Sequence, residues 1–115
     1  MYFFRINYKD QVYIQKRVSK DIWENLYQFV LLEAKSKISD AQLTSGEVIR
    51  KLLGKTSYLV SSISPEKVQL LTHQTIKGCF VTISIDHPML IKGYHRIPES
   101  ELSGLAFPKF ITSSM

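Results

Sequence analysis

The stretch Gln69–Gly78, with the sequence QLLTHQTIKG, places strand-like segments on either side of three consecutive polar residues. The segment Thr75–Ile85 ends in an alternation of apolar residues with threonine and serine, which is typical of a half-buried strand. Thr72, His73 and Gln74 interrupt the apolar run, and three adjacent hydrogen-bonding side chains fit poorly in a core. The pattern therefore predicts two strands joined by a polar bend, and it requires a sheet with an exposed connection.

Other segments extend this sheet. Tyr2–Tyr8 is rich in aromatic and β-favouring residues and predicts a strand. A turn at Lys9–Gln11 leads to the alternating segment Val12–Lys16, so the two segments are expected to form a hairpin. Further strands are expected at Tyr27–Glu33, Ser57–Ile63, Val68–Thr72 and Tyr94–Ile97.

One main helix is expected in the middle of the chain, from about Ser45 to Leu53. Thr44-Ser45-Gly46-Glu47 fits the S/T-x-x-E capping box. Apolar residues then follow at helical spacing, and Gly54 is a natural stop. Short helical turns are expected at Ser100–Leu105 and Pro108–Ile111. These elements predict an α+β domain with a mixed or antiparallel sheet, one main helix and short C-terminal helical turns.

The length and cysteine content set further limits. A chain of 115 residues corresponds to one domain with a single core. The abrupt start in a strand pattern at Tyr2 suggests a domain belonging to a longer protein, although a complete small protein is the alternative. A single cysteine, Cys79, can neither form an internal disulfide nor hold an iron–sulfur cluster alone. An intracellular compartment is expected, and no apolar run is long enough for a transmembrane helix.

The charge balance favours an acidic partner. Fifteen lysine and arginine residues against ten acidic residues give a net charge of +5. Nucleic acid is the commonest partner of such chains. Lys16, Arg17 and Lys20 form a basic loop that could contact backbone phosphates, and Lys77 could do the same beside the polar bend. A solvated turn is the alternative interpretation of the basic loop.

Three segments carry a resemblance to a known family. They are VYIQKRVSKDIWENLYQFVLLE, QLLTHQTIKGCFVTI and GYHRIPESELSGLAFPKFI, and in this order they resemble the C-terminal domain of MutY-type adenine DNA glycosylases. The resemblance extends from about Phe3 to Ile111. It implies that residues 1–115 form one Nudix-like domain of a bacterial, cytoplasmic, DNA-associated repair enzyme. That enzyme removes adenine mispaired with 8-oxoguanine in base excision repair.

The resemblance also implies that the chemistry lies elsewhere. In this family a separate N-terminal helical domain carries the catalytic residues and a [4Fe-4S] cluster, and that domain is not in this sequence. The expected partners are therefore this N-terminal domain and double-stranded DNA containing an 8-oxoguanine:adenine pair. No cofactor, metal ion or catalytic residue is expected in the C-terminal domain itself.

The Nudix hydrolase box, G-x5-E-x7-R-E-U-x-E-E-x-G-U, tests for hydrolase chemistry. When its last glycine is placed on Gly54, the paired glutamates fall on Lys51 and Leu52, and the Arg-Glu pair falls on Glu47 and Val48. A cation and an aliphatic side chain cannot replace the carboxylates that hold Mg²⁺. We therefore expect no hydrolase activity from this domain.

The same resemblance assigns a role to the polar bend. At this position the family often has Phe-Ser-His in a loop that reaches the oxidised base, and Leu71, Thr72 and His73 occupy it here. Oxidation of guanine converts N7 from an acceptor to a donor and adds an oxygen acceptor beside it. The Thr72 hydroxyl can accept from N7–H and donate to O8, because a hydroxyl offers both functions. By resemblance His73 would probe the exocyclic amine, while Leu71 can wedge by apolar contact but cannot stack as phenylalanine does.

The polar bend and the domain as a whole each have an alternative interpretation without DNA recognition. The bend can be a strand end or β-bulge with solvated side chains. The whole domain can be a catalytically inactive Nudix-like module for protein interaction or nucleotide sensing. Side chains expected in the core are Trp23, Leu26, Tyr27, Phe29, Cys79 and Phe107. Neither His87 nor His95 has a companion at zinc-ligand spacing.

Overall fold

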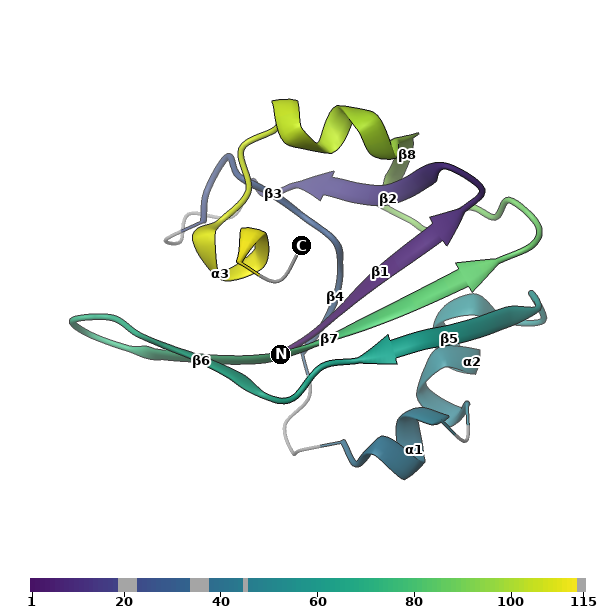
Figure 1. Ribbon diagram of the computed structural model, residues 1–115, viewed down its shortest axis with the longest axis horizontal. Coiled ribbons are helices and arrows are strands. Elements are labelled where there is room, and N and C mark those ends of the chain that lie inside the picture. The colour runs from purple at the N-terminus through teal and green to yellow at the C-terminus, as the bar shows by residue number, and fades with distance from the viewer. Residues whose placement is uncertain (19–22, 34–37, 45, 114–115) are drawn as a thin grey trace.

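The computed structural model describes residues 1–18, 23–33, 38–44 and 46–113, which form one eight-stranded sheet with helices on both faces (Figure 1). The strands are β1 Tyr2–Tyr8, β2 Gln11–Lys16, β3 Tyr27–Gln28, β4 Val30–Leu32, β5 Tyr58–Ile63, β6 Lys67–Leu70, β7 Thr75–Ile85 and β8 His95–Pro98. The helices are α1 Asp40–Thr44, α2 Glu47–Leu53, the 3-10 helix η1 Glu99–Gly104 and α3 Lys109–Thr112. This architecture confirms the α+β class expected from the sequence.

The centre of the sheet is a parallel pair, β1 and β7. Their register runs from Tyr2 opposite Cys79 to Tyr8 opposite Ile85. On the other side of β1, the antiparallel hairpin partner β2 pairs only near the turn, and β4 pairs with the opposite end of β1. The strand order is β3-β2-β1-β7-β5, with β6 on β7 and β8 on β2. The sheet is therefore mixed.

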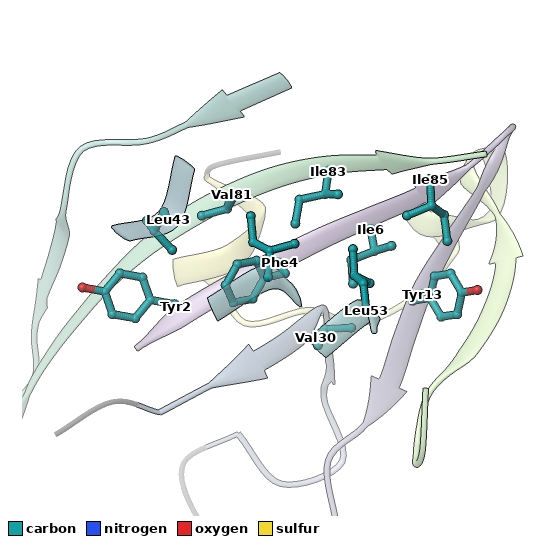
Figure 2. Close-up of a cluster of buried hydrophobic side chains, with 11 residues drawn as sticks. Tyr2, Phe4, Ile6, Tyr13, Val30, Leu43, Leu53, Val81, Ile83 and Ile85 are labelled. Atoms are coloured by element: carbon teal, nitrogen blue, oxygen red, sulfur yellow. The ribbon is translucent and has the colours of Figure 1, made fainter. Parts of the chain in front are cut away.

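One face of the sheet packs against α1 and α2. Phe4 and Ile6 of β1 and Ile83 of β7 point to this side and are fully buried (Figure 2). Leu43 of α1 and Leu53 of α2 close the cluster from the other side. The apolar side chains that alternate along β1 and β7 thus meet the apolar faces of two short helices.

The opposite face carries an aromatic cluster beneath α3 and η1. The centres of the Phe3 and Phe80 rings lie 5.2 Å apart. The centre of the Trp23 ring lies 5.9 Å from that of Phe110 in α3. The alternation of β1 therefore buries both of its faces, with Phe3 on one side and its neighbours on the other.

The core residues expected from the sequence lie in or against the two clusters. Trp23 and Phe29 are buried, and Leu26, Tyr27 and Cys79 are partly buried. The ring of Phe107 packs 5.5 Å from that of Phe29, which joins the C-terminal segment to the sheet.

Several elements differ from the expectation. The single strand expected at Tyr27–Glu33 is two strands, because Tyr27–Gln28 pairs with β2 whereas Val30–Leu32 pairs with β1. A short helix, α1, occupies part of a polar stretch for which no element was expected. The second helix begins at Glu47, after Gly46 with φ of 87°, and Gly46 offers no side-chain cap, so the capping box does not start this helix. Ser45 lies outside the described residues.

Two buried tyrosines fasten loops to the sheet. The Tyr13 hydroxyl donates to the Met89 carbonyl at 2.6 Å and accepts from the Met89 amide at 3.0 Å. Tyr2 makes the same pair of bonds with Ile38. No helix in the described part of the chain is long and apolar enough to cross a membrane.

Candidate nucleic-acid interface

The polar bend lies at the tip of a hairpin that extends beyond the body of the domain (Figure 1). β6 pairs with the first residues of β7, from Lys67 opposite Gly78 to Leu70 opposite Thr75. The connecting residues Leu71–Gln74 form a tight turn, in which the Leu71 amide donates to the Gln74 carbonyl at 2.8 Å. The two strands predicted around the bend are therefore confirmed, and β6 ends two residues earlier than expected.

The side chains of the bend face solvent. Thr72, His73 and Gln74 are exposed, and Leu71 is 36% exposed. Within the described residues, the side chains of Thr72 and His73 make no hydrogen bond, so their polar atoms are available to a partner.

The hairpin has two unlike faces. On one face Ile76 and Gly78 are buried against α3. On the other face Val68 and Leu70 are 49% and 78% exposed, and Lys77, which pairs with Val68, is exposed beside them. The exposed face therefore combines apolar side chains with a cation.

The three basic residues singled out in the sequence that the structure describes lie on different segments. Lys77 lies on the hairpin, whereas Lys16 is exposed at the far end of β2. The Arg17 guanidinium donates to Oε1 of Gln28 at 2.5 Å and lies 5.7 Å from the centre of the Trp23 ring. Arg17 thus holds the segment that leads into β3. Lys20 lies outside the described residues.

A groove at the base of the hairpin is a feature that the sequence interpretation missed. It has a volume of about 200 Å³ and lies between β6 and α3. Its lining includes two lysines, one from each element, and the residues are Lys67, Val68, Gln69, Lys109, Phe110 and Ser113. The sequence carries no local signal for it, since its two lysines are 42 residues apart.

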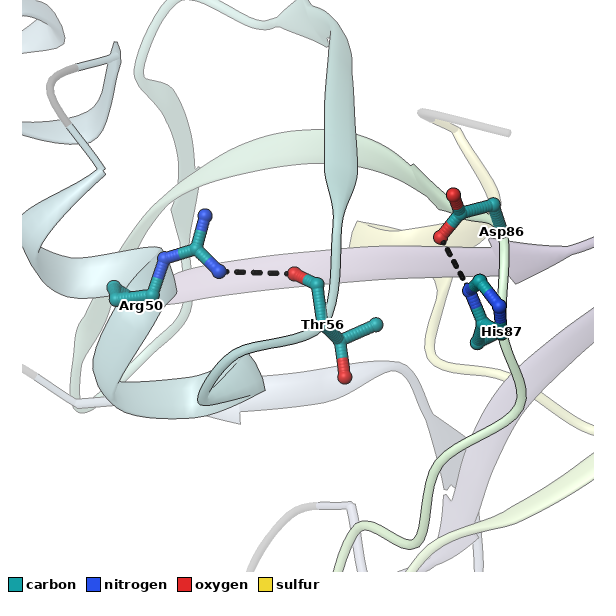
Figure 3. A network of polar contacts seen from close by, with 4 residues as sticks. All are labelled: Arg50, Thr56, Asp86 and His87. Atoms are coloured by element: carbon teal, nitrogen blue, oxygen red, sulfur yellow. Dashed lines mark hydrogen bonds and ion pairs between the residues drawn. The ribbon is translucent and has the colours of Figure 1, made fainter.

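The opposite end of β7 carries a small polar network (Figure 3). Asp86 Oδ1 lies 3.0 Å from Nδ1 of His87, and this hydrogen bond holds the pKa of the exposed Asp86 carboxyl below its usual value. Nearby, the Arg50 guanidinium donates to the carbonyls of Gly54 at 2.8 Å and Thr56 at 3.0 Å. These contacts belong to the scaffold rather than to the hairpin.

The helix aligned with the Nudix box borders an apolar pocket. The pocket has a volume of about 360 Å³ and is lined by Phe4, Val30, Leu31, Leu32, Val48, Lys51 and Leu52. Lys51 and Leu52 stand at the positions of the paired glutamates. Across the residues that the structure describes, no three histidine, cysteine or acidic side chains are grouped to hold a metal ion.

Comparisons with known proteins define the fold. No family model matches the chain, and no curated protein matches it. Among solved structures, the chain is similar to RenU, described as a Nudix hydrolase from M. smegmatis, with a TM-score of 0.59. The two share 10% sequence identity, and the match covers 98% of this chain and 77% of that chain. At this identity the likeness concerns the backbone alone, and the chain has a Nudix-like α+β fold.

Proposed function

We propose that this chain is the lesion-recognition domain of an adenine DNA glycosylase, and that it reads 8-oxoguanine opposite the adenine to be removed. The observation that carries the proposal is the projecting hairpin, whose tip exposes Thr72 and His73 with no side-chain hydrogen bond to the described part of the chain. Exposed polar side chains that a rigid strand pair presents to solvent are suited to contact a base edge.

The hydroxyl of Thr72 suits the oxidised base better than the normal one. In 8-oxoguanine the hydroxyl accepts from N7–H and donates to O8. Against guanine neither bond can form, because N7 is then an acceptor and O8 is absent, and the hydroxyl can make only one bond to these positions, by donating to N7. A good base-edge contact contributes about 1–3 kcal/mol of discrimination. Thr72 alone can therefore supply a measurable preference.

The neighbouring residues complete the proposed contact. His73 probes the exocyclic amine of the lesion, and Leu71 packs beside the base by apolar contact. Lys77 on the exposed face of the hairpin contacts a phosphate. Lys16, Lys20 and Arg17 remain candidates for phosphate contact, with Arg17 the least available because its guanidinium binds Gln28 and covers Trp23.

The proposal includes the rest of the protein. Adenine excision requires a second domain on the N-terminal side, carrying the [4Fe-4S] cluster and the catalytic groups, in a bacterial cytoplasmic enzyme. An upstream reading frame that encodes a helix-hairpin-helix region and four clustered cysteines is the expected finding. An unrelated upstream sequence would contradict the proposal.

The test uses the complete protein with its catalytic domain. Adenine excision is measured on duplexes with adenine opposite 8-oxoguanine or opposite guanine, for the natural protein and for the double variant Thr72→Ala, His73→Ala. The preference for the 8-oxoguanine duplex is expected to fall in the double variant. Gln74→Ala, in the same turn, is the matched control and should retain the preference. If the double variant keeps the same preference for the 8-oxoguanine duplex, the proposal is wrong.

The apolar pocket beside α2 favours a second candidate, a nucleotide-sensing domain. Its 360 Å³ volume is within the range of small-molecule sites, and Lys51 on its wall could pair with a phosphate. Titration with nucleotides, followed by NMR, separates the two candidates. Chemical-shift changes at Val48 and Leu52 support nucleotide sensing, whereas changes confined to the hairpin on addition of lesion duplex support base recognition.

A further inference from the structure

The hairpin of β6 and β7 carries a strip of exposed side chains along one face. Val68 and Leu70 of β6 lie on this face, and they are 49% and 78% exposed. The register places Lys77 opposite Val68 and Thr75 opposite Leu70, and both of these β7 residues are exposed as well. Because directly paired residues share a face of the sheet, the four side chains form one continuous strip. This exposed strip begins beside the bend and combines two apolar side chains, one hydroxyl and one ammonium group.

The opposite face of the hairpin is covered by the domain. Ile76 of β7 is only 3% exposed, and Gly78 lies against the Phe110 ring of α3. The N-terminal amino group donates to the Lys77 carbonyl at 3.0 Å, which ties the start of the chain to the same strand. The hairpin is therefore anchored at its base while it extends beyond the body of the domain (Figure 1). The exposed strip is the face that it presents to a partner.

A two-stranded ribbon of this kind fits the major groove of DNA. Paired strands lie about 4.8 Å apart, and the groove, about 12 Å wide, admits a two-stranded β-ribbon. Lys77 gives the exposed strip a charge complementary to the phosphates that border the groove. The apolar side chains also find a partner there, because the C5-methyl group of thymine projects into the major groove.

We propose that the hairpin enters the major groove with the exposed strip on the groove floor, and that Leu70 packs against the methyl group of a thymine beside the lesion. This inference rests on the proposed function and adds a preference for the neighbouring sequence. Leu70 lies two residues before Thr72, which is about 7 Å along a strand at roughly 3.3 Å per residue. Base pairs rise about 3.4 Å each along DNA, so the thymine lies within about two base pairs of 8-oxoguanine.

Removal of a methyl group from the DNA tests this contact. Thymines on either side of 8-oxoguanine are replaced one at a time by uracil, which keeps the base pair and lacks the C5-methyl group. The complete protein is titrated with these duplexes, in which a 2′-fluorine on the target adenosine prevents excision during the measurement. One replacement should weaken binding about two- to fourfold, since burial of one methyl group corresponds to roughly a fourfold change in affinity. In the Leu70→Ala variant the same replacement should have no effect.

Leu59→Ala is the matched control. Leu59 is 69% exposed, but it lies on β5 opposite Ser84 rather than on the hairpin. This variant should keep the natural difference between the thymine and uracil duplexes. Equal binding of all these duplexes by the natural protein overturns the inference, and so does a Leu70→Ala variant that retains the difference.

Another protein surface is the alternative occupant of the exposed strip. In that case the natural protein shows no difference between thymine and uracil, and Leu70→Ala lowers the melting temperature of the complete protein. Because Leu70 is 78% exposed in this domain, the substitution should leave the melting temperature unchanged if the strip faces DNA. A lowered melting temperature without a methyl effect therefore contradicts the inference.

The methyl contact and the reading of the lesion can fail separately. The double variant Thr72→Ala, His73→Ala is titrated with the same duplexes and with matching duplexes that contain guanine. If this variant keeps the lesion preference while the methyl effect depends on Leu70, the major-groove contact holds and the proposed reading of the base fails. If it loses the lesion preference while no uracil replacement changes binding, the proposed function holds and the contact of Leu70 is wrong.

Discussion

Gly78 and Phe110 are in such close contact that a Cβ on Gly78 would lie 3.0 Å from Cε2 and 3.2 Å from Cζ of the Phe110 ring. The same Cβ would lie 3.4 Å from the Met1 carbonyl oxygen. The absence of a side chain at one position of β7 thus allows α3 to lie against the base of the hairpin. The groove between α3 and β6 depends on this approach.

Replacement of Gly78 with alanine is expected to destabilise the domain. The added methyl group overpacks the contact with Phe110, which typically costs about 1–3 kcal/mol. Urea denaturation followed by circular dichroism measures the change. Gly104→Ala is the control, because a Cβ there meets no atom within 4 Å. A Gly78→Ala variant as stable as Gly104→Ala would show that α3 moves away without cost.

Replacement of Thr72 separates the hydroxyl from the shape of the side chain. If the proposed function holds, Thr72→Ser retains the preference for 8-oxoguanine and Thr72→Val loses about 1–3 kcal/mol of it. Valine keeps the branched shape without the hydroxyl, and neither variant should change stability, since the position is exposed. Binding of the complete protein to lesion and undamaged duplexes provides the measurement. Equal preferences in the serine and valine variants would exclude the hydroxyl as the reading group.

Arg50 is expected to stabilise the connection between α2 and β5. Its guanidinium makes two hydrogen bonds to backbone carbonyls and lies 4.7 Å from the centre of the Tyr58 ring. Arg50→Ala should lower the free energy of unfolding by about 1–2 kcal/mol, given the usual contributions of such bonds and of exposed cation–π contacts. Chemical denaturation tests this, with Lys55→Ala as an exposed control in the same connection. A loss no larger than that of the control would contradict the expectation.

The Asp86–His87 pair predicts a specific titration behaviour. The hydrogen bond from His87 lowers the pKa of Asp86 below 3.8, so His87→Ala should raise it toward that value. A carboxyl whose pKa is lowered by folding stabilises the native state above its unfolded pKa, and the effect disappears as the pH falls through the native pKa. Carboxyl ¹³C chemical shifts measured against pH report the pKa directly. His95→Ala should leave the Asp86 titration unchanged, and so would His87→Ala if the hydrogen bond had no influence.

The strands were the most predictable part of the fold. The strand Tyr2–Tyr8 follows from its aromatic and β-favouring residues, and Thr75–Ile85 follows from the alternation at its end. The parallel pairing of these two strands was not predictable, since it joins residues 77 positions apart and no local pattern encodes it. The break at Phe29 was not predictable for the same reason. The residues before it pair with β2 and the residues after it pair with β1, and both pairings are set by the tertiary fold.

The exposed bend was predictable, and the groove at its base was not. Thr72 and His73 are adjacent in sequence, so a local argument places both at one connection. Lys67 and Lys109 line the same groove only because α3 packs against the base of the hairpin. Arg17 was predicted as a candidate for phosphate contact, but its guanidinium binds Gln28. Nothing in the basic sequence around Arg17 indicates this internal hydrogen bond.

The single long strand β7 joins two regions that differ in how deeply their side chains are buried. Residues such as Val81 and Ile83 are fully buried, and almost any replacement there costs stability. The side chains of the turn that precedes the strand, Leu71–Gln74, are exposed. Substitutions there are expected to change the stability of the fold very little. A substitution in this turn can therefore change the chemistry of the exposed tip while the scaffold beneath it stays the same.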